Sequence, residues 1–233
     1  MSDFETVLGN QLLSALSHSA CKQLLSFGEV VSLTSEQMIH RASQSITEIY
    51  FPVTAIFSNT IEMADGTTSE VALIGKEGLV GLSAILGSYI STINSVVRVS
   101  GTALKLPTET IKQEFHRHEE LQRLLLLYTH SYLNHLAHIA ACNSLHSVEQ
   151  RFARFLLLIH DHITLENLPL TQKTISLMLG VRRASVTETA IALQNRKIIK
   201  YSRGKIIILN RRQLETIACE CYGKIKASYT IFE

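Results

Sequence analysis

Hydrophobic residues recur at helical intervals near the start of the chain and at alternating positions further on. Leucines at helical spacing run through residues 8–27, which predicts one or two short helices. From Val30 to Leu106 the apolar stretches are short and strand-like, with Asp65-Gly66 as a tight turn. The expected strands include residues 49–53, 55–57, 61–63 and 70–74. Several short strands at regular intervals are typical of a small β-sandwich or β-roll.

A single long helix is predicted from Thr108 to about Cys142, because this segment contains neither Gly nor Pro. Two rows of residues repeat along it at steps of four and three. The first row is Leu121, Leu125, Tyr128, Tyr132, His135, Ile139 and Cys142, and the second is Leu126, Thr129, Leu133, Leu136, Ala140 and Asn143. Two rows predict two contacts, one with the β-domain and one with the same helix of a second subunit. We assign the row from Leu121 to Ile139 to dimerisation and expect a homodimer; the alternative is a buried helix in a monomer.

Residues 170–196 carry the pattern of a helix-turn-helix. Thr171 is a candidate N-cap, Gly180 ends the first helix in a left-handed conformation, and a second helix begins at Arg182 or Arg183. Residues 198–209 then predict a strand, a turn and a strand, which form a basic wing. In this motif the second helix enters the DNA major groove and basic wing residues contact phosphates. The candidate DNA contacts are Thr171, Gln172, Arg182, Arg183, Ala184, Ser185, Thr187, Glu188, Arg203 and Lys205.

The formal net charge of +2 is unevenly distributed along the chain. Residues 1–144 contain 8 Lys and Arg against 13 Asp and Glu, a net of −5, whereas residues 145–233 contain 14 against 7, a net of +7. A basic C-terminal part favours a polyanion partner such as double-stranded DNA, although ordinary solvated surfaces also carry such an excess. Because the sequence has no basic leader and no apolar run of roughly 18 residues, we expect a cytoplasmic protein with no membrane partner.

The cysteines and histidines raise the question of a metal. The four cysteines, which we expect to be buried or incidental thiols, are Cys21, Cys142, Cys219 and Cys221. Cys219 and Cys221 are too close in sequence to complete a tetrahedral site alone. His135, His138 and Cys142 could share one helical face and bind a metal, but we favour a heptad position for His135 and a solvated His138. A single cysteine in the first hundred residues argues against an N-terminal iron–sulfur cluster. We therefore expect no metal and no other cofactor.

The order of β-roll, long helix and winged helix-turn-helix resembles the Crp/Fnr family of bacterial transcription regulators over nearly the whole chain. The segments that carry the resemblance are IYFP (49–52), GLVGL (78–82), MLGVRRASVT (178–187) and YSRGKI (201–206). The resemblance implies an α+β fold with an N-terminal double-stranded β-helix (β-roll) sensor domain over residues 1–107. A dimerisation helix over 108–144 and a winged helix-turn-helix DNA-binding domain over 145–233 would follow. It further implies a homodimer that reads a palindromic promoter site, with RNA polymerase as a partner.

The functional residues of the family transfer only in part. Members that bind cyclic AMP hold the ribose with a Gly-Glu-Leu turn and the phosphate with an Arg that precedes Ser or Thr. The matching positions here are Gly78-Leu79-Val80 and Asn94-Ser95, so both charged ligands are absent. Arg98 is an alternative anion clamp, although we favour a surface or strand-pairing role for it. These six residues mark a possible effector pocket whose effector is unknown, and ligand-independent regulation is the alternative.

In the recognition helix, Arg183 matches a family arginine, whereas Ala184 and Glu188 replace a glutamate and an arginine. The promoter sequence of other members therefore does not carry over to this chain.

Two other function classes compete with a regulator: an interaction module that keeps the fold without binding DNA, and an enzyme. The sequence contains no phosphate-binding Gly-rich loop, no nucleophile elbow and no His-Glu-x-x-His pattern, so we predict that the protein is not an enzyme. Binding of promoter DNA by the purified protein would separate the regulator from both rivals.

Overall fold

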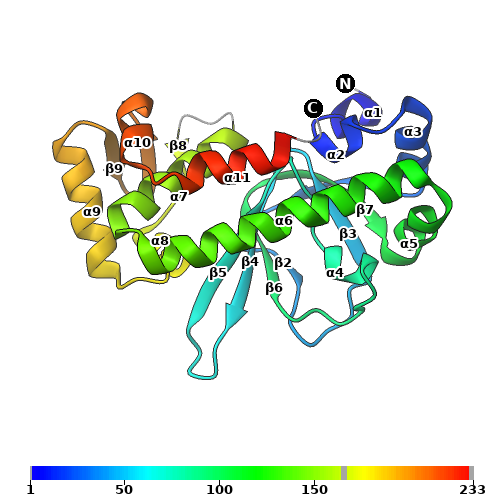
Figure 1. Cartoon of the computed structure of the whole chain (residues 1–233), viewed down its shortest axis with the longest axis horizontal. Helices are drawn as coiled ribbons and strands as arrows, with labels where there is room; N and C mark the ends of the chain where they lie inside the picture. The colour runs from blue at the N-terminus through cyan, green and yellow to red at the C-terminus, as the bar shows by residue number, and fades with distance from the viewer. Residues whose placement is uncertain (1, 164–166, 231–233) are drawn as a thin grey trace.

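The computed structural model describes residues 2–163 and 167–230. A β-rich N-terminal domain lies beneath one half of a long helix, and a smaller C-terminal domain lies at the other end of that helix (Figure 1). This is the mixed helix-and-sheet architecture that the sequence predicts.

Three short helices precede the first strand: α1 (Asp3–Val7), α2 (Gln11–Ser14) and α3 (His18–Ser26). The last two agree with the one or two helices expected over residues 8–27, whereas α1 was not predicted. Asn10 explains the break between the first two. Its side-chain oxygen accepts hydrogen bonds from the amides of Leu12 and Leu13 and so caps α2. Its side-chain nitrogen donates to the carbonyl oxygens of Pro52 and Gly78, at 2.8 and 2.9 Å, and thereby ties the helices to the β-domain.

The β-roll consists of two antiparallel sheets, ordered β1-β7-β3 and β2-β6-β4-β5 within the described residues. Its elements are β1 (Glu29–Leu33), β2 (Met38–His40), β3 (Glu48–Pro52), β4 (Ile56–Glu62), β5 (Thr68–Ile74), α4 (Leu82–Ile85), β6 (Asn94–Val99) and β7 (Gly101–Pro107). The expected strands 55–57 and 61–63 correspond to the two ends of the single strand β4, which excludes Ala55 and Met63. An irregularity between Asn59 and Thr60 shifts the register with β5 without ending the pairing.

The predicted single helix is two helices, α5 (Thr108–Arg117) and α6 (Glu119–Leu145). His118 separates them in an extended conformation, with φ −119° and ψ 104°. The break follows from contacts with α3: the Glu120 carboxylate accepts hydrogen bonds from the backbone nitrogen and the hydroxyl of Ser17, at 2.6 and 2.8 Å. An acidic first turn also suits the N-terminus of α6. Tertiary contacts therefore override a sequence that contains no helix breaker.

The C-terminal domain begins with α7 (Val148–His162). It continues with β8 (Asn167–Leu168), α8 (Gln172–Leu179), α9 (Arg183–Asn195), β9 (Ile199–Ser202), β10 (Lys205–Ile208), α10 (Arg211–Ile217) and α11 (Cys221–Tyr229). The last two helices had no counterpart in the sequence prediction. Helix α11 lies along α6 (Figure 1), where the Ser131 hydroxyl donates to the carbonyl oxygen of Ser228.

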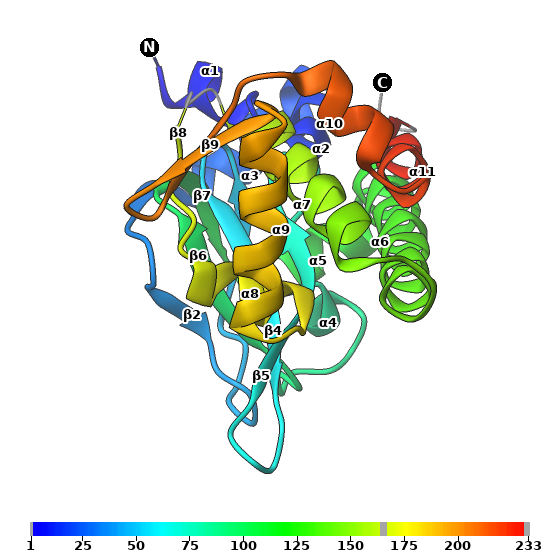
Figure 2. The ribbon, with the colours of Figure 1, turned by 90° about the vertical axis from the view of Figure 1, so that its left-hand side faces the viewer.

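The two domains contact each other as well as α6. Helix α8 packs against β5 of the β-roll. The Glu77 carboxylate, just after β5, lies 3.1 Å from the imidazole of His162 at the end of α7. Helix α9 lies on the outer side of the C-terminal domain, as the end-on view shows (Figure 2).

Candidate functional site

The turn between α8 and α9 is built as the sequence predicts. The Thr171 hydroxyl accepts a hydrogen bond from the Thr174 amide and caps α8. Gly180 ends α8 with φ +60° and ψ 39°, a left-handed conformation that glycine adopts at little cost. Beneath the turn, the buried Arg151 of α7 donates a hydrogen bond to the carbonyl oxygen of Leu179. The turn is therefore fixed both by its own sequence and by α7.

Helix α9 buries Val186, Ala190 and Leu193 against the domain core and leaves the opposite face to solvent. The predicted DNA contacts Arg182, Arg183, Ala184 and Glu188 are exposed at its N-terminal half, and Ser185 and Thr187 are half-buried. The Thr187 hydroxyl donates a hydrogen bond to the backbone carbonyl oxygen of Arg183, within the same helix.

The wing is a two-residue hairpin between β9 and β10. Its tip residues Arg203 and Gly204 have φ values of +50° and +75°, the positive angles that a tight hairpin turn needs. A Cβ atom on Gly204 would lie 3.3 Å from the side chain of Thr171, so the wing tip adjoins the start of α8. Arg203 and Lys205 are both exposed. The strand β8, which pairs with β10, was not predicted.

Tyr201 of β9 connects the wing to both helices of the motif. Burial raises the pKa of its hydroxyl, and a hydrogen bond with the Gln172 backbone and the charge of Arg183 oppose that shift. Gln172, Arg183 and the wing therefore lie next to one another.

The predicted dimerisation row requires a correction. Leu121, Leu125 and Tyr128 are at most 2% exposed, because they pack into the core shared with the β-roll. His135 is buried against α11, where its Nδ1 lies 3.0 Å from the Tyr229 hydroxyl. Burial lowers the pKa of His135 to about 3, and the charges of Arg154 and His162 add to that shift.

The remaining two members of that row also face the chain itself. Tyr132 accepts a hydrogen bond from Asn59 of the roll, and Ile139 is half-buried at the same core. The second row of α6 is the exposed one: Leu126 and Leu133 are 51% and 59% exposed, and Ala140 and Asn143 also face solvent. Apolar side chains on this face mark it as a candidate contact surface.

A cavity of about 190 Å³ lies between the β-roll and α6. Two residues of the predicted effector pocket, Leu79 and Ser95, line it. Gly78, Val80, Asn94 and Arg98 are not among its lining residues, and an effector role for these four stays a prediction. Gly78 instead packs against Tyr128, and the Asn94 side chain accepts a hydrogen bond from the Ala42 amide.

The lining of this cavity contains no Lys, Arg, Asp or Glu among the described residues. Its His40 donates a hydrogen bond from Nε2 to the Glu48 carbonyl oxygen, and burial lowers the pKa of this histidine, so the ring is neutral near pH 7. Arg98, the alternative anion clamp, forms a 2.7 Å ion pair with Glu36 away from the cavity. The cavity suits an uncharged ligand better than an anion.

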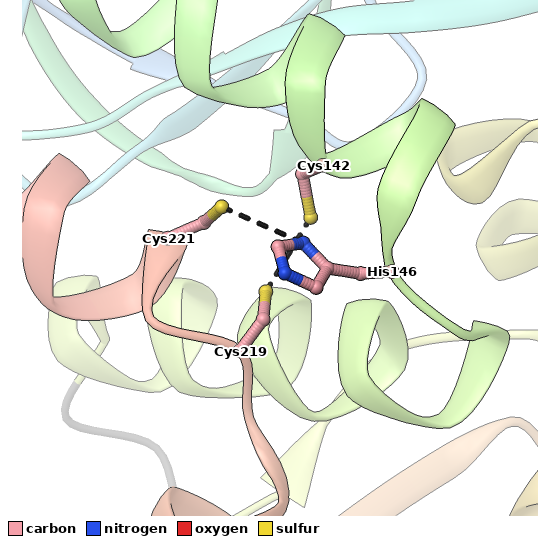
Figure 3. A group of neighbouring side chains, drawn as sticks. All are labelled: Cys142, His146, Cys219 and Cys221. Carbon is pink, nitrogen blue, oxygen red and sulfur yellow. Dashed lines mark hydrogen bonds between the residues drawn. The ribbon is translucent and has the colours of Figure 1, made fainter.

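Three of the four cysteines meet at the junction of α6 with the C-terminal domain (Figure 3). Cys142 lies in the last turn of α6 and His146 directly follows that helix, while Cys219 precedes α11 and Cys221 is its first residue. A hydrogen bond from Cys219 lowers the pKa of Cys142, as does the charge of Arg154, and together they outweigh the effect of burial. All four cysteines are buried free thiols, which agrees with the sequence-based expectation, but the grouping of three of them with His146 was not predicted.

The family model of the Crp-like helix-turn-helix domain matches residues 150–217, which run from α7 to the end of α10. These residues are therefore similar to the Crp-like helix-turn-helix domain. Within it, Gly180 forms the turn and Arg203-Gly204 forms the wing tip.

Solved structures of Crp/Fnr-type regulators share the fold around this Crp-like domain. FixK2 from Bradyrhizobium japonicum has a TM-score of 0.72 at 16% identity, over 82% of this chain and 98% of its own. A putative Crp/Fnr-family transcriptional regulator from Eubacterium rectale gives 0.70 at 20% identity, over 88% and 96%. The c-di-GMP-responsive global regulator CLP of Xanthomonas campestris gives 0.69 at 12% identity, over 82% and 99%. The chain therefore has the fold of Crp/Fnr transcription regulators.

No curated protein matches the chain. Across residues 2–163 and 167–230, none of the helices has the length and apolar character that a membrane span requires.

Proposed function

We propose that this chain is a transcription regulator that binds double-stranded DNA as a homodimer, and that it is not an enzyme. The observation that carries the proposal is the Crp-like helix-turn-helix domain whose α9 presents Arg182, Arg183 and Glu188 to solvent beside the wing residues Arg203 and Lys205. An exposed helix N-terminus enters the major groove in this motif, and arginine can read guanine there. The proposal implies a cytoplasmic location, where promoter DNA and RNA polymerase are found.

The charge distribution supports an anionic partner on this side of the molecule. The net charge of +7 over residues 145–233 contrasts with −5 over residues 1–144. Positive charge concentrated on the domain that carries the motif increases affinity for the phosphate backbone. The acidic N-terminal part would at the same time be repelled from DNA.

Dimerisation supplies the second half-site. The exposed face of α6 offers Leu126, Leu133 and Ala140 for a symmetric contact with the same helix of a second chain. Two copies of α9 would then read a palindromic site, with half-sites about one DNA turn, or roughly 34 Å, apart.

The cavity between the roll and α6 is the proposed effector site. At about 190 Å³ it is close in size to cavities of roughly 150 Å³ that hold a benzene-sized molecule. Leu133 and Leu136 of α6 belong both to its lining and to the second row of the helix. A small uncharged ligand there would therefore contact the same helix that we assign to the dimer.

Selection of binding sites from a random pool of duplex DNA tests the proposal. The purified protein should enrich a palindrome with two half-sites one turn apart. Replacement of Arg183 by Ala should change the enriched sequence, whereas replacement of the exposed Arg123 of α6 should leave it as it is. Failure to enrich any sequence at low salt would reject DNA-binding regulation and favour an interaction module.

A further inference from the structure

The side chains of Cys142, His146, Cys219 and Cys221 form a compact group with the chemistry of a metal site (Figure 3). One potential ligand atom from each residue lies within 4.8 Å of all the others. The sulfurs of Cys142 and Cys219 are 3.4 Å apart, and Cys221 Sγ lies 3.7 Å from His146 Nδ1. In a tetrahedral site with Zn–S bonds of about 2.3 Å, neighbouring sulfurs are separated by roughly 3.8 Å. The four atoms therefore lie close enough for small side-chain shifts to complete a tetrahedral site.

We propose that Cys142, His146, Cys219 and Cys221 bind one zinc ion in a closed tetrahedral Cys₃His site. Three thiolates and one imidazole are a donor set that favours zinc over the harder divalent ions. All four ligands come from the protein, so the ion has no open position for a substrate. The site is structural and stands independently of the DNA-binding proposal.

The imidazole of His146 is oriented for this role by Glu220. His146 Nε2 lies 3.3 Å from the Glu220 carboxylate, while Nδ1 points toward the sulfur of Cys221. A ligand histidine commonly donates its second N–H to a carboxylate, which fixes the ring and its tautomer. Glu220 lies between Cys219 and Cys221 in the sequence, so the same short segment supplies two ligands and this positioning residue.

The charges around the site are also compatible with a bound zinc ion. Three thiolates, a neutral imidazole and Zn²⁺ give a net charge of −1. Two arginines of α7 are buried nearby: Arg154 acts electrostatically on Cys142, and Arg151 interacts with both Cys142 and Cys219. Their positive charges stabilise a negatively charged centre. Each thiol that becomes a ligand releases its proton to solvent, so zinc binding strengthens as the pH rises.

The ion would connect parts of the chain that are far apart in sequence. Cys142 and His146 lie at the end of α6, just before the link to α7, whereas Cys219 and Cys221 follow α10. Zinc would thereby fix α11 on α6 and set the orientation of the C-terminal domain. Arg151 links this junction to the helix-turn-helix, because its guanidinium donates a hydrogen bond to the Leu179 carbonyl oxygen.

Metal analysis of the purified full chain is the first test. Elemental analysis should find one zinc per chain in protein prepared under reducing conditions. After removal of zinc, Co²⁺ should give the visible bands of tetrahedral cobalt together with a sulfur-to-cobalt charge-transfer band. Apoprotein should also exchange the amides of α11 faster than holoprotein, with the β-roll strands unaffected.

Variants assign the ligands. Cys221→Ser should weaken the charge-transfer band and reduce zinc affinity, whereas Cys21→Ser should not, because Cys21 is buried outside the cluster. His146→Ala should likewise reduce zinc affinity. Its matched control is His138→Ala, which changes a histidine of α6 that lies outside the cluster. Glu220→Gln should lower zinc affinity about 10–100-fold without loss of the bound ion at saturation. The Glu220 side chain is 72% exposed, so this variant tests the site even if Cys221→Ser fails to fold.

Three results would overturn the proposal. The first is apoprotein that shows no charge-transfer band with Co²⁺, or shows one that is unchanged in Cys221→Ser. The second is a Cys142–Cys219 disulfide in protein that binds no zinc in either redox state. The third is iron with inorganic sulfide in place of zinc.

Discussion

The Tyr128 hydroxyl donates a hydrogen bond to the backbone carbonyl oxygen of Leu79, at 3.2 Å. Both residues line the cavity of the β-roll, and Tyr128 belongs to α6. The close approach of Tyr128 to Leu79 requires glycine at position 78, because a Cβ atom on Gly78 would lie 2.5 Å from the Tyr128 oxygen. The wall of the proposed effector site and the helix of the proposed dimer are therefore in direct contact, and a ligand that moved one would move the other.

Gly78→Ala should destabilise the fold. Tyr128 is fully buried and has no room to withdraw from the added methyl group, so we expect a loss of roughly 1–3 kcal/mol in the free energy of unfolding. Urea denaturation measures this change. Gly223→Ala is the control: an added Cβ meets nothing within 4 Å there, and alanine in a helix is up to about 1 kcal/mol more favourable than glycine. Equal stability of the two variants would contradict the close packing of Gly78 with Tyr128.

Arg183 and Lys205 should differ in what they contribute to DNA binding. If Arg183 reads a base edge, Arg183→Ala should cost roughly 1–3 kcal/mol on the preferred site and relax the choice of one base in each half-site. Lys205→Ala should weaken all sequences about equally and reduce the salt dependence, because a phosphate contact carries no sequence information. Binding titrations on matched and mismatched duplexes distinguish the two. An Arg183→Ala protein with unchanged affinity and motif would refute the assignment.

Leu133→Asp should convert the proposed dimer to a monomer. Leu133 is 59% exposed within one chain and lies at the middle of the second row of α6, where a buried carboxylate without a partner would oppose association. Light scattering at micromolar concentration measures the mass. Leu209→Asp is the control, since Leu209 is 55% exposed but lies outside α6. Wild-type protein that is monomeric with and without DNA would rule out the dimer altogether.

The helix-turn-helix could be predicted because its signals are local. The capping hydroxyl of Thr171, the left-handed Gly180 and the turn at Arg203-Gly204 each act within a few residues, and the structure confirms all three elements. The two rows of α6 could not be told apart in this way. Both are apolar at the same spacing, and only the surfaces of the roll and α11 decide that Tyr128 faces inward while Leu133 faces solvent.

The Cys₃His cluster was missed for a related reason. The pair Cys142 and His146, one helical turn apart, and the pair Cys219 and Cys221 were each visible as a two-ligand signal. Neither pair suffices for a tetrahedral ion. Their meeting depends on the return of α11 along α6, which is a long-range packing event that follows helices the sequence pattern did not predict.

Cyclic AMP should not bind the β-roll at low micromolar concentration. Leu79 stands in the place of a carboxylate that would hold the ribose, and the cavity lining offers the cyclic phosphate no cationic side chain among the described residues. Loss of a charged, hydrogen-bonded partner in a partly desolvated site commonly costs several kcal/mol, or about a thousandfold in affinity. Isothermal titration with cyclic AMP and cyclic GMP provides the measurement. Saturable binding that Arg98→Ala abolishes would show that Arg98 leaves Glu36 to act as the clamp.

Glu70 should make the protein less stable as the pH rises. This residue of β5 is buried, and burial raises the pKa of its carboxyl to about 7 from the ordinary 4.5. A hydrogen bond from Ser58 and the charges of Arg98 and Arg154 limit the shift without cancelling it. Arg154 belongs to α7, so the protonation state of Glu70 bears on the contact between the roll and the C-terminal domain.

The sign of the effect follows from proton binding in the two states. Between about pH 4.5 and 7 the folded chain keeps a proton on Glu70 that the unfolded chain has lost, so the free energy of unfolding falls as the pH rises through this window. Glu70→Gln keeps the carbonyl acceptor for Ser58 without the charge. It should therefore be more stable than wild type at pH 8, by roughly 1–3 kcal/mol, and should flatten the pH dependence. Urea denaturation at pH 5, 6, 7 and 8 measures both quantities, with Glu62→Gln, an exposed glutamate of the same hairpin, as the control. If Glu70→Gln and wild type lose stability in parallel from pH 5 to 8, the buried carboxyl of Glu70 is ionised throughout and the guanidinium groups of Arg98 and Arg154 outweigh its burial.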